Sequence, residues 1–110
     1  MQVYIVVGGL KTQQKGSYET FVKGESTEWT LHEGADYDKP GATGNLRGIT
    51  INNIFYVVGG WDAPEPNSDL ICRFNQDFLP RWSCDWKMKT GRRRPGLAAV
   101  KYSEISANCN

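Results

Sequence analysis

The sequence predicts an all-β protein built from repeated four-stranded antiparallel units. The apolar run Val3–Val7, followed by Gly8-Gly9, returns 51 positions later as Ile54–Val58 followed by Gly59-Gly60. An aromatic pair with fixed spacing also occurs twice, and no segment has the apolar spacing of a helix. A repeat near 50 residues indicates modules that cannot bury their own apolar faces, so function is expected from an array rather than from a single motif.

Each apolar run predicts a strand that is buried on both faces, because β-branched and aromatic side chains fill five consecutive positions. The glycine pair that follows each run predicts a turn in which a side chain would clash.

The aromatic pairs predict one hairpin in each module. Seven residues separate Phe21 from Trp29, and seven separate Phe74 from Trp82. The residues between them are polar and include Gly24 or Pro80, as turns do. We expect each Phe to end one strand and each Trp to begin the next, so that the two rings pair and are buried against a neighbouring module.

A third element repeats less strictly. Arg47 precedes Gly48-Ile49-Thr50-Ile51, and Arg94 precedes Pro95-Gly96 and an apolar run with the same order of residue types. Together these patterns predict eight strands, at residues 2–8, 17–21, 29–32, 47–52, 54–59, 69–74, 82–88 and 96–102.

This combination of apolar residues, double glycine, spaced aromatic–tryptophan pair and module-opening arginine resembles the kelch repeat. The resemblance implies a β-propeller with one four-stranded blade per repeat, of which this chain holds about two. Repeat 1 would span residues 1–46 and lack its first strand, repeat 2 would span 47–93, and 94–110 would give the first strand of a further blade plus a tail. The chain departs from the family in having Phe21 and Phe74 where Tyr is usual.

Two blades cannot close a propeller, and two arrangements would supply the others. In the first, the chain is a piece of a longer protein that holds the remaining blades. In the second, each subunit donates its C-terminal strand to the first module of a neighbour, and three chains form a closed homo-oligomer of six blades.

Two of the three cysteines are placed to form a disulfide. Cys72 lies two residues before Phe74 and Cys84 two residues after Trp82, so pairing of the aromatics sets the cysteines opposite each other. A bond would clamp the hairpin and indicate an extracellular location, whereas two small buried thiols would suit a cytoplasmic protein. Cys109 is left without an obvious partner in the chain.

The sequence offers no set of residues for catalysis, metal binding or cofactor binding. Its 13 basic and 12 acidic residues give a net charge of +1, so neither nucleic acid nor a membrane surface is an expected partner. His32 is the only histidine, has no nucleophile at a useful spacing, and is expected to be a solvated loop residue. Some proteins with a kelch-like propeller are copper enzymes of the galactose-oxidase kind, and a fragment of one is the alternative; one His cannot complete their Tyr, Cys and His ligand set.

Two regions are candidates for contact with a partner protein. By the resemblance, Arg47 and Arg94 lie near the rim of the central channel, where several arginines would suit carboxylates on a partner; alternatively, each packs against a blade and pairs with an acidic side chain. Trp61 with Asp62 and Glu65 forms a candidate binding loop, although Trp61 would serve equally in packing between blades. We therefore expect a non-catalytic kelch scaffold that binds protein through inter-strand loops; a secreted structural kelch protein is a further alternative.

Overall fold

The computed structural model describes residues 2–8, 17–33, 40, 44–61 and 66–100, and this part of the chain is all-β. It forms seven strands: β1 (Val3–Val7), β2 (Tyr18–Val22), β3 (Thr30–His32), β4 (Arg47–Ile51), β5 (Ile54–Val58), β6 (Leu70–Phe74) and β7 (Trp82–Lys87). The described residues include no helix of the length and apolar character that crossing a bilayer requires.

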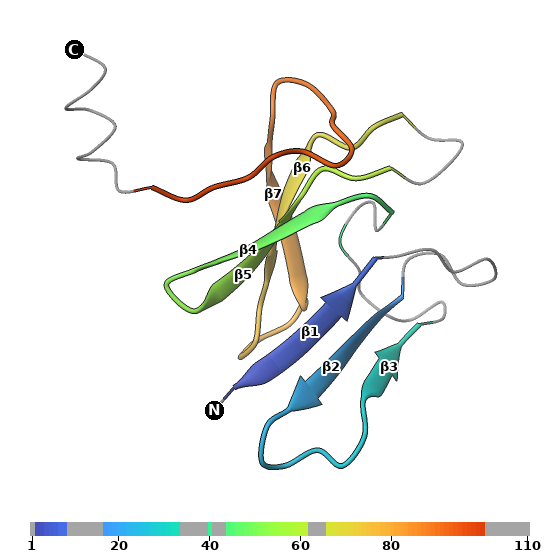
Figure 1. The fold of residues 1–110 in the computed structure, drawn as a ribbon, viewed down its shortest axis with the longest axis vertical. Coiled ribbons are helices and arrows are strands. Elements are labelled where there is room, and N and C mark those ends of the chain that lie inside the picture. The colour runs from blue at the N-terminus through green and yellow to red at the C-terminus, as the bar shows by residue number, and fades with distance from the viewer. Residues whose placement is uncertain (1, 9–16, 34–39, 41–43, 62–65, 101–110) are drawn as a thin grey trace.

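The strands make two antiparallel sheets (Figure 1). One has three strands in the order β1-β2-β3, and the other has four strands in the order β4-β5-β6-β7. In both sheets, strands that follow each other in the sequence lie side by side. The predicted all-β class is confirmed, and the first seven predicted strands are all present, with bounds within one or two residues of those expected.

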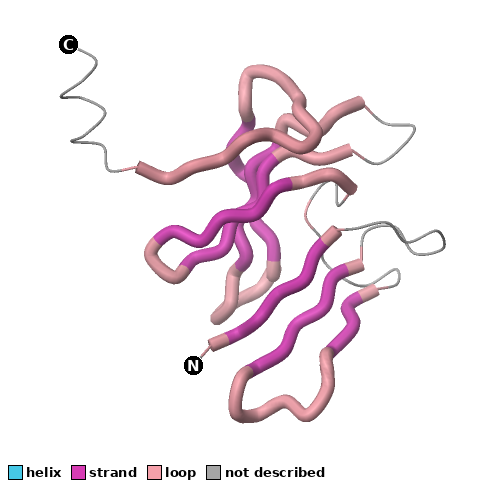
Figure 2. Tube along the Cα trace, viewed as in Figure 1, coloured by secondary structure: helices cyan, strands magenta, loops and turns pink. Residues whose placement is uncertain are grey.

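The eighth strand was expected at residues 96–102, and residues 96–100 form no strand. Residues 96–100 run as an irregular segment away from the sheets (Figure 2), and residues 101–102 lie outside the described part. A strand exists only where a neighbour accepts its backbone hydrogen bonds, and neither sheet includes this segment.

The tight β4–β5 turn fixes the register of the first hairpin in the larger sheet. Asn52 and Asn53 both have a positive φ, of 50° and 63°. Two-residue hairpin turns of this kind need left-handed conformations, which Asn tolerates better than most residues do. The turn places Ile51 opposite Ile54 and Arg47 opposite Val58.

The core lies between the two sheets. Val57, Cys72, Phe74 and Trp82 of the larger sheet are buried together with Tyr18 of the smaller one. The Tyr18 ring meets the rings of Phe74 and Trp82 edge-on, with centroids 6.3 and 5.5 Å apart. A single large side chain of β2 therefore fills the centre of the contact between the sheets.

Both predicted aromatic pairs are in ring contact. Phe74 lies opposite Trp82 in the register of β6 and β7, with ring centroids 5.1 Å apart. The Phe21 and Trp29 rings are 5.4 Å apart. Only the first pair is buried, because Tyr18 of the other sheet packs on it.

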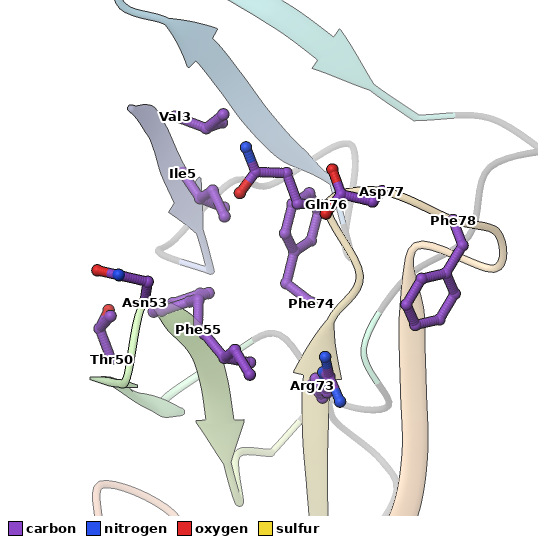
Figure 3. Close-up of a pocket in the computed structure, with 11 residues that line it drawn as sticks. Val3, Ile5, Thr50, Asn53, Phe55, Arg73, Phe74, Gln76, Asp77 and Phe78 are labelled. Carbon is purple, nitrogen blue, oxygen red and sulfur yellow. The ribbon is translucent and has the colours of Figure 1, made fainter. Parts of the chain in front are cut away.

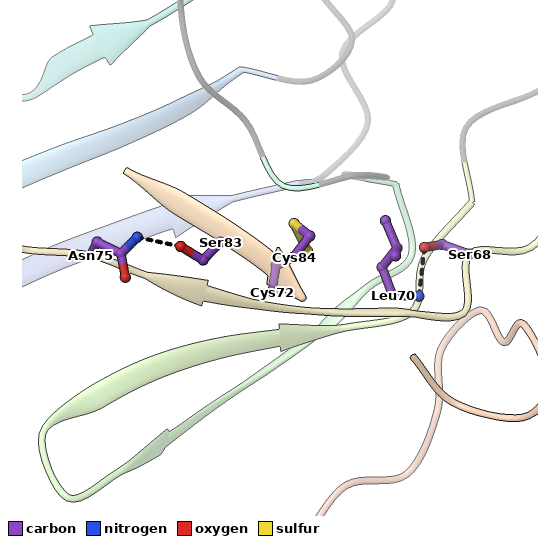
Figure 4. Close-up of a disulfide and its surroundings, with 6 residues drawn as sticks. All are labelled: Ser68, Leu70, Cys72, Asn75, Ser83 and Cys84. Carbon is purple, nitrogen blue, oxygen red and sulfur yellow. Dashed lines mark hydrogen bonds between the residues drawn. A yellow bond between two sulfur atoms is a disulfide. The ribbon is translucent and has the colours of Figure 1, made fainter. Parts of the chain in front are cut away.

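The predicted disulfide joins Cys72 to Cys84 (Figure 4), so the alternative of two free thiols is wrong. The two Cα atoms are 4.1 Å apart. The register shifts by one residue here: Arg73 faces Ser83 and Ile71 faces Trp86, so β7 carries one extra residue opposite Cys72. The bond therefore clamps the hairpin at a β-bulge.

A buried asparagine fastens the turn of the same hairpin. The Asn75 side chain is 1% exposed, and its Nδ2 donates to the Pro80 carbonyl and to Ser83 Oγ, both at 2.7 Å. The Asn75 N–H also donates to the Arg81 carbonyl at 2.6 Å. Since buried amides are costly without partners, these bonds make the conformation of this turn specific.

Candidate protein-binding site

The candidate site lies at the end of the four-stranded sheet where the second glycine pair stands. Gly59 and Gly60 are buried and have φ of 71° and 107°. The Gly60 N–H donates to the Arg92 carbonyl at 2.8 Å, and the Arg92 N–H donates to the Ser68 carbonyl at 2.9 Å. A Cβ on Gly59 would collide with the Arg92 carbonyl oxygen, so glycine is needed for the chain at residues 91–94 to cross here.

We call residues 91–94 the arginine loop, and two of its side chains are held by contacts from distant parts of the sequence. The Arg93 guanidinium lies 4.5 Å from the centroid of the Trp61 ring, a cation–π contact. The Arg94 Nε donates to Asn45 Oδ1 at 2.8 Å, and the Arg94 N–H donates to the Asn45 carbonyl at 2.7 Å. The arginine loop is therefore positioned by the segments before β4 and after β5.

The arginine side chains at this end of the sheet are exposed and have no acidic partner among the described residues. Arg47, Arg92, Arg93 and Arg94 are all exposed. Within the described ranges, none of the four forms an ion pair: Arg94 bonds to the neutral Asn45, and Arg47 reaches only the Leu46 carbonyl, at 3.4 Å. The pairing with acidic side chains that the sequence left open is thus not seen in this part of the chain.

The predicted binding loop is only partly described. The Trp61 side chain is half-buried beneath Arg93, and the backbone N–H of Trp61 donates to the Gly44 carbonyl at 2.6 Å. Asp62 and Glu65 lie outside the described residues, as does Gly9. Gly8, at the corresponding end of β1, has a positive φ of 85°, like Gly59.

Sequence reasoning missed Asn45, although it joins the arginine loop to the start of β4. Asn45 has a φ of 53°. A signal was available in the sequence: Asn45 stands two residues before the module-opening Arg47, where a turn is expected, and Asn is among the few residues that tolerate a positive φ in a turn. Its link to Arg94, 49 positions away, has no local signature.

The expectation for His32 is wrong. It is the last residue of β3 and half-buried, not a solvated loop residue, and its ring stacks on Tyr18 with centroids 4.5 Å apart. His32 Nε2 and Thr20 Oγ1 are hydrogen-bonded at 2.9 Å. Burial, and secondarily the positive charge of Arg81, hold the pKa of His32 below its ordinary value of 6.5. The ring is therefore neutral near pH 7 and serves in packing between the sheets.

Two small cavities lie where the sheets meet. One, of about 170 Å³, is lined by Val3 and Ile5 of β1 and by Phe55, Arg73 and Asp77 among others (Figure 3). A second, of about 160 Å³, lies beside His32 and Arg81. Ligand pockets usually have about 300–1,000 Å³, so neither cavity has the size of a ligand pocket.

Comparisons with known proteins add no identification. No protein-family model matches the chain, and no curated protein matches it. Within the described ranges, His, Cys, Asp and Glu side chains form no group of three or more that could hold a metal ion.

Proposed function

We propose that the chain is a non-catalytic segment of a kelch-type β-propeller that binds a partner protein through the loops at one end of its sheets. The observation that carries the proposal is the arginine loop: exposed guanidinium groups that have no acidic partner among the described residues, held in place by Trp61 and Asn45. Guanidinium groups present several N–H donors in a fixed plane, which suits carboxylates on a partner.

Fixed loops favour binding over a merely solvated surface. The arginine loop makes three backbone hydrogen bonds, to Gly60, Ser68 and Asn45. Its first residue, Gly91, also lies so close to Asn67 that a Cβ there would collide with the Asn67 carbonyl oxygen. Preorganised donors lose less conformational entropy when they bind than flexible ones do.

The disulfide fits a protein of an oxidising compartment, which is the setting that the secreted alternative requires.

The experiment uses two fluorescein-labelled peptides, one with alternating Glu and Gly and one with Gln in place of each Glu. We expect the full chain to bind the Glu peptide, with an affinity that falls as salt is raised. Arg93→Ala and Arg94→Ala should each weaken binding by about ten-fold, which corresponds to one charge-assisted contact of roughly 1.4 kcal/mol.

Lys87→Ala is the matched control, because Lys87 is an exposed cation at the end of β7 and lies outside the arginine loop. Equal binding of the Glu and Gln peptides would contradict the proposal. So would a loss of affinity in the control as large as that in Arg93→Ala.

A further inference from the structure

The two sheets carry equivalent rows of aromatic side chains. Each residue of the first row recurs 51 or 53 positions later in the second. We call Tyr4, Phe21 and Trp29 the exposed row, and Phe55, Phe74 and Trp82 the buried row. The rings of each row touch, although through different pairs. In the exposed row Phe21 contacts Tyr4 and Trp29, with centroids 6.3 and 5.4 Å apart. In the buried row Trp82 contacts Phe55 and Phe74, with centroids 6.2 and 5.1 Å apart.

The two rows differ in what covers them. In the buried row, Phe74 is 9% exposed and Trp82 is 4% exposed, because Tyr18 of the three-stranded sheet packs on them. In the exposed row, Tyr4 is 45% exposed and Trp29 is 43% exposed. The exposed row therefore lacks the sheet that its equivalent has, although it presents the same kind of apolar surface.

The strand at the edge of the exposed row also lacks a neighbour. β5 pairs with β4 on one side and with β6 on the other, whereas β1, its equivalent, pairs with β2 only within the described part of the chain. A groove of about 460 Å³ is lined by Val3–Val6 of β1, by Trp29 and, across from them, by Thr50 and Phe55. Its lining is mainly apolar, as a site for an added strand should be.

The sequence of residues 94–100 matches the missing neighbour. This segment repeats the residue order of β4, and Gly96 corresponds to Gly48. Gly48 is needed where it stands, since a Cβ there would lie 2.7 Å from the Phe55 ring. Among the described residues, a Cβ on Gly96 would meet nothing within 4 Å, and the φ of Gly96 is not in the left-handed region, so this part of the chain does not explain the glycine.

The β4–β5 register supplies the explanation. Gly48 lies opposite Val57, with the Phe55 ring beside it. Applied to β1, the same register sets Gly96 opposite Val6 and next to the ring of Tyr4, the counterpart of Phe55. Residues 94–100 leave the body of their own chain on the side away from β1 (Figure 1), so this segment does not reach the β1 of its own chain, whereas the same segment of a neighbouring copy can.

We propose that this protein self-associates head to tail: residues 95–100 of a second copy add to β1, and that copy's four-stranded sheet covers the exposed row. The repeat identifies the covering face. Ile5 lies on the face of the smaller sheet that packs on the core, and its counterpart 51 positions later is Tyr56. The face of the larger sheet that carries Tyr56 is therefore the one that would cover the exposed row of the next copy. Tyr56 and Trp86 have rings 6.5 Å apart on that face, and Trp86 is 48% exposed. One neighbouring copy thus supplies both the strand and the sheet.

A head-to-tail interface uses two different surfaces of each copy, so it repeats until a ring closes or a filament grows. This inference concerns the sheets and does not depend on the arginine loop. Its failure would leave the peptide-binding proposal standing, and the reverse is also true.

The test measures the mass of the full chain in solution by sedimentation over a range of concentrations. Wild-type protein should reach species larger than a dimer. Tyr4→Glu blocks the exposed row, Trp86→Glu blocks the covering face, and each variant alone should remain a monomer. An equimolar mixture of the two should form dimers and nothing larger, because one intact pair of surfaces remains.

Leu79→Glu is the control, since Leu79 is 75% exposed in the β6–β7 turn and lies on neither surface; its mass should equal that of wild type. Gly96→Val tests the added strand and should weaken association while leaving thermal unfolding of the monomer unchanged. If Tyr4→Glu fails to fold, Val6→Glu replaces it, because Val6 is 52% exposed on the same strand.

Wild-type protein that stays monomeric at every concentration overturns the proposal. Tyr4→Glu protein that folds and keeps the wild-type mass does so as well. A mixture of the two blocked variants that remains monomeric excludes the head-to-tail arrangement.

Discussion

At the scale of single residues, His32 shows how a neighbour from another sheet sets a side chain's chemistry. Its imidazole lies flat on Tyr18 and bonds to Thr20, while Arg81 approaches from the β6–β7 turn of the larger sheet. Both burial and the positive charge of Arg81 disfavour the protonated ring, so the pKa of His32 in the folded protein lies below 6.5.

This lowered pKa predicts a loss of stability in mild acid. As the pH falls below about 6.5, the ordinary His pKa, the unfolded chain takes up a proton at His32 that the folded chain refuses, so the free energy of unfolding decreases. The decrease should end once the pH is below the pKa of the folded state. Urea unfolding from pH 7.5 to 5 measures it.

His32→Asn is the matched variant, because Asn keeps a hydrogen-bonding group near Thr20 but does not titrate. Its free energy of unfolding should depend less on pH than that of wild type over the same range. Equal slopes for the two proteins would show that other groups cause the dependence.

At the scale of elements, the β6–β7 hairpin is the most strongly constrained part of the chain. Its strands are joined by the Cys72–Cys84 bond, its turn is fastened by Asn75, and its rings Phe74 and Trp82 enter the core. We therefore expect the disulfide to contribute substantially to the stability of the four-stranded sheet.

The disulfide closes a short loop, with a sequence separation of 12 residues. For loops of about this size, the restricted unfolded chain accounts for roughly 3 kcal/mol. The Cys72→Ala/Cys84→Ala double variant should lose about that much free energy of unfolding, measured by denaturation under oxidising conditions. Adding a reductant should lower the free energy of unfolding of wild type but not of the double variant. An equal decrease in both proteins would show that loss of the disulfide is not the cause.

The sequence was enough to predict elements whose signals are local. The apolar runs, the Phe–Trp spacing and the cysteine positions predicted seven strands and the disulfide, because each depends on a period of two or on a hairpin register. The β-bulge at Cys72 was not predicted, since one extra residue in β7 leaves no mark in the residue types.

Contacts between elements far apart in the sequence were predicted poorly. The Arg94–Asn45 bond and the burial of His32 depend on how loops and sheets meet, which no local pattern encodes. The strand expected at 96–102 has a local signal of the right kind, but a strand also needs a neighbour within reach, and residues 96–100 pair with no strand in the described part of the chain.

At the scale of the whole molecule, two sheets are held together mainly by one buried ring. Tyr18 is 3% exposed and contacts both Phe74 and Trp82, with Ile5 and Val7 packed around the same cluster. The smaller sheet has three strands, no disulfide among its described residues and an exposed outer face. We therefore expect the smaller sheet to be the less stable of the two, because no covalent bond among its described residues restricts its unfolded chain.

Tyr18→Ala should therefore uncouple the two sheets rather than unfold the molecule uniformly. Removing a buried aromatic ring costs about 3–5 kcal/mol, and the loss falls on the sheet that has the fewest other contacts. Hydrogen exchange should show fast exchange of the amides of β1–β3, while the disulfide-bonded strands β6 and β7 remain protected. Phe78→Ala is the control, because it removes a ring of similar size that is 51% exposed and outside this core. Uniform loss of protection in all seven strands of the Tyr18→Ala variant would show instead that both sheets fold as one cooperative unit.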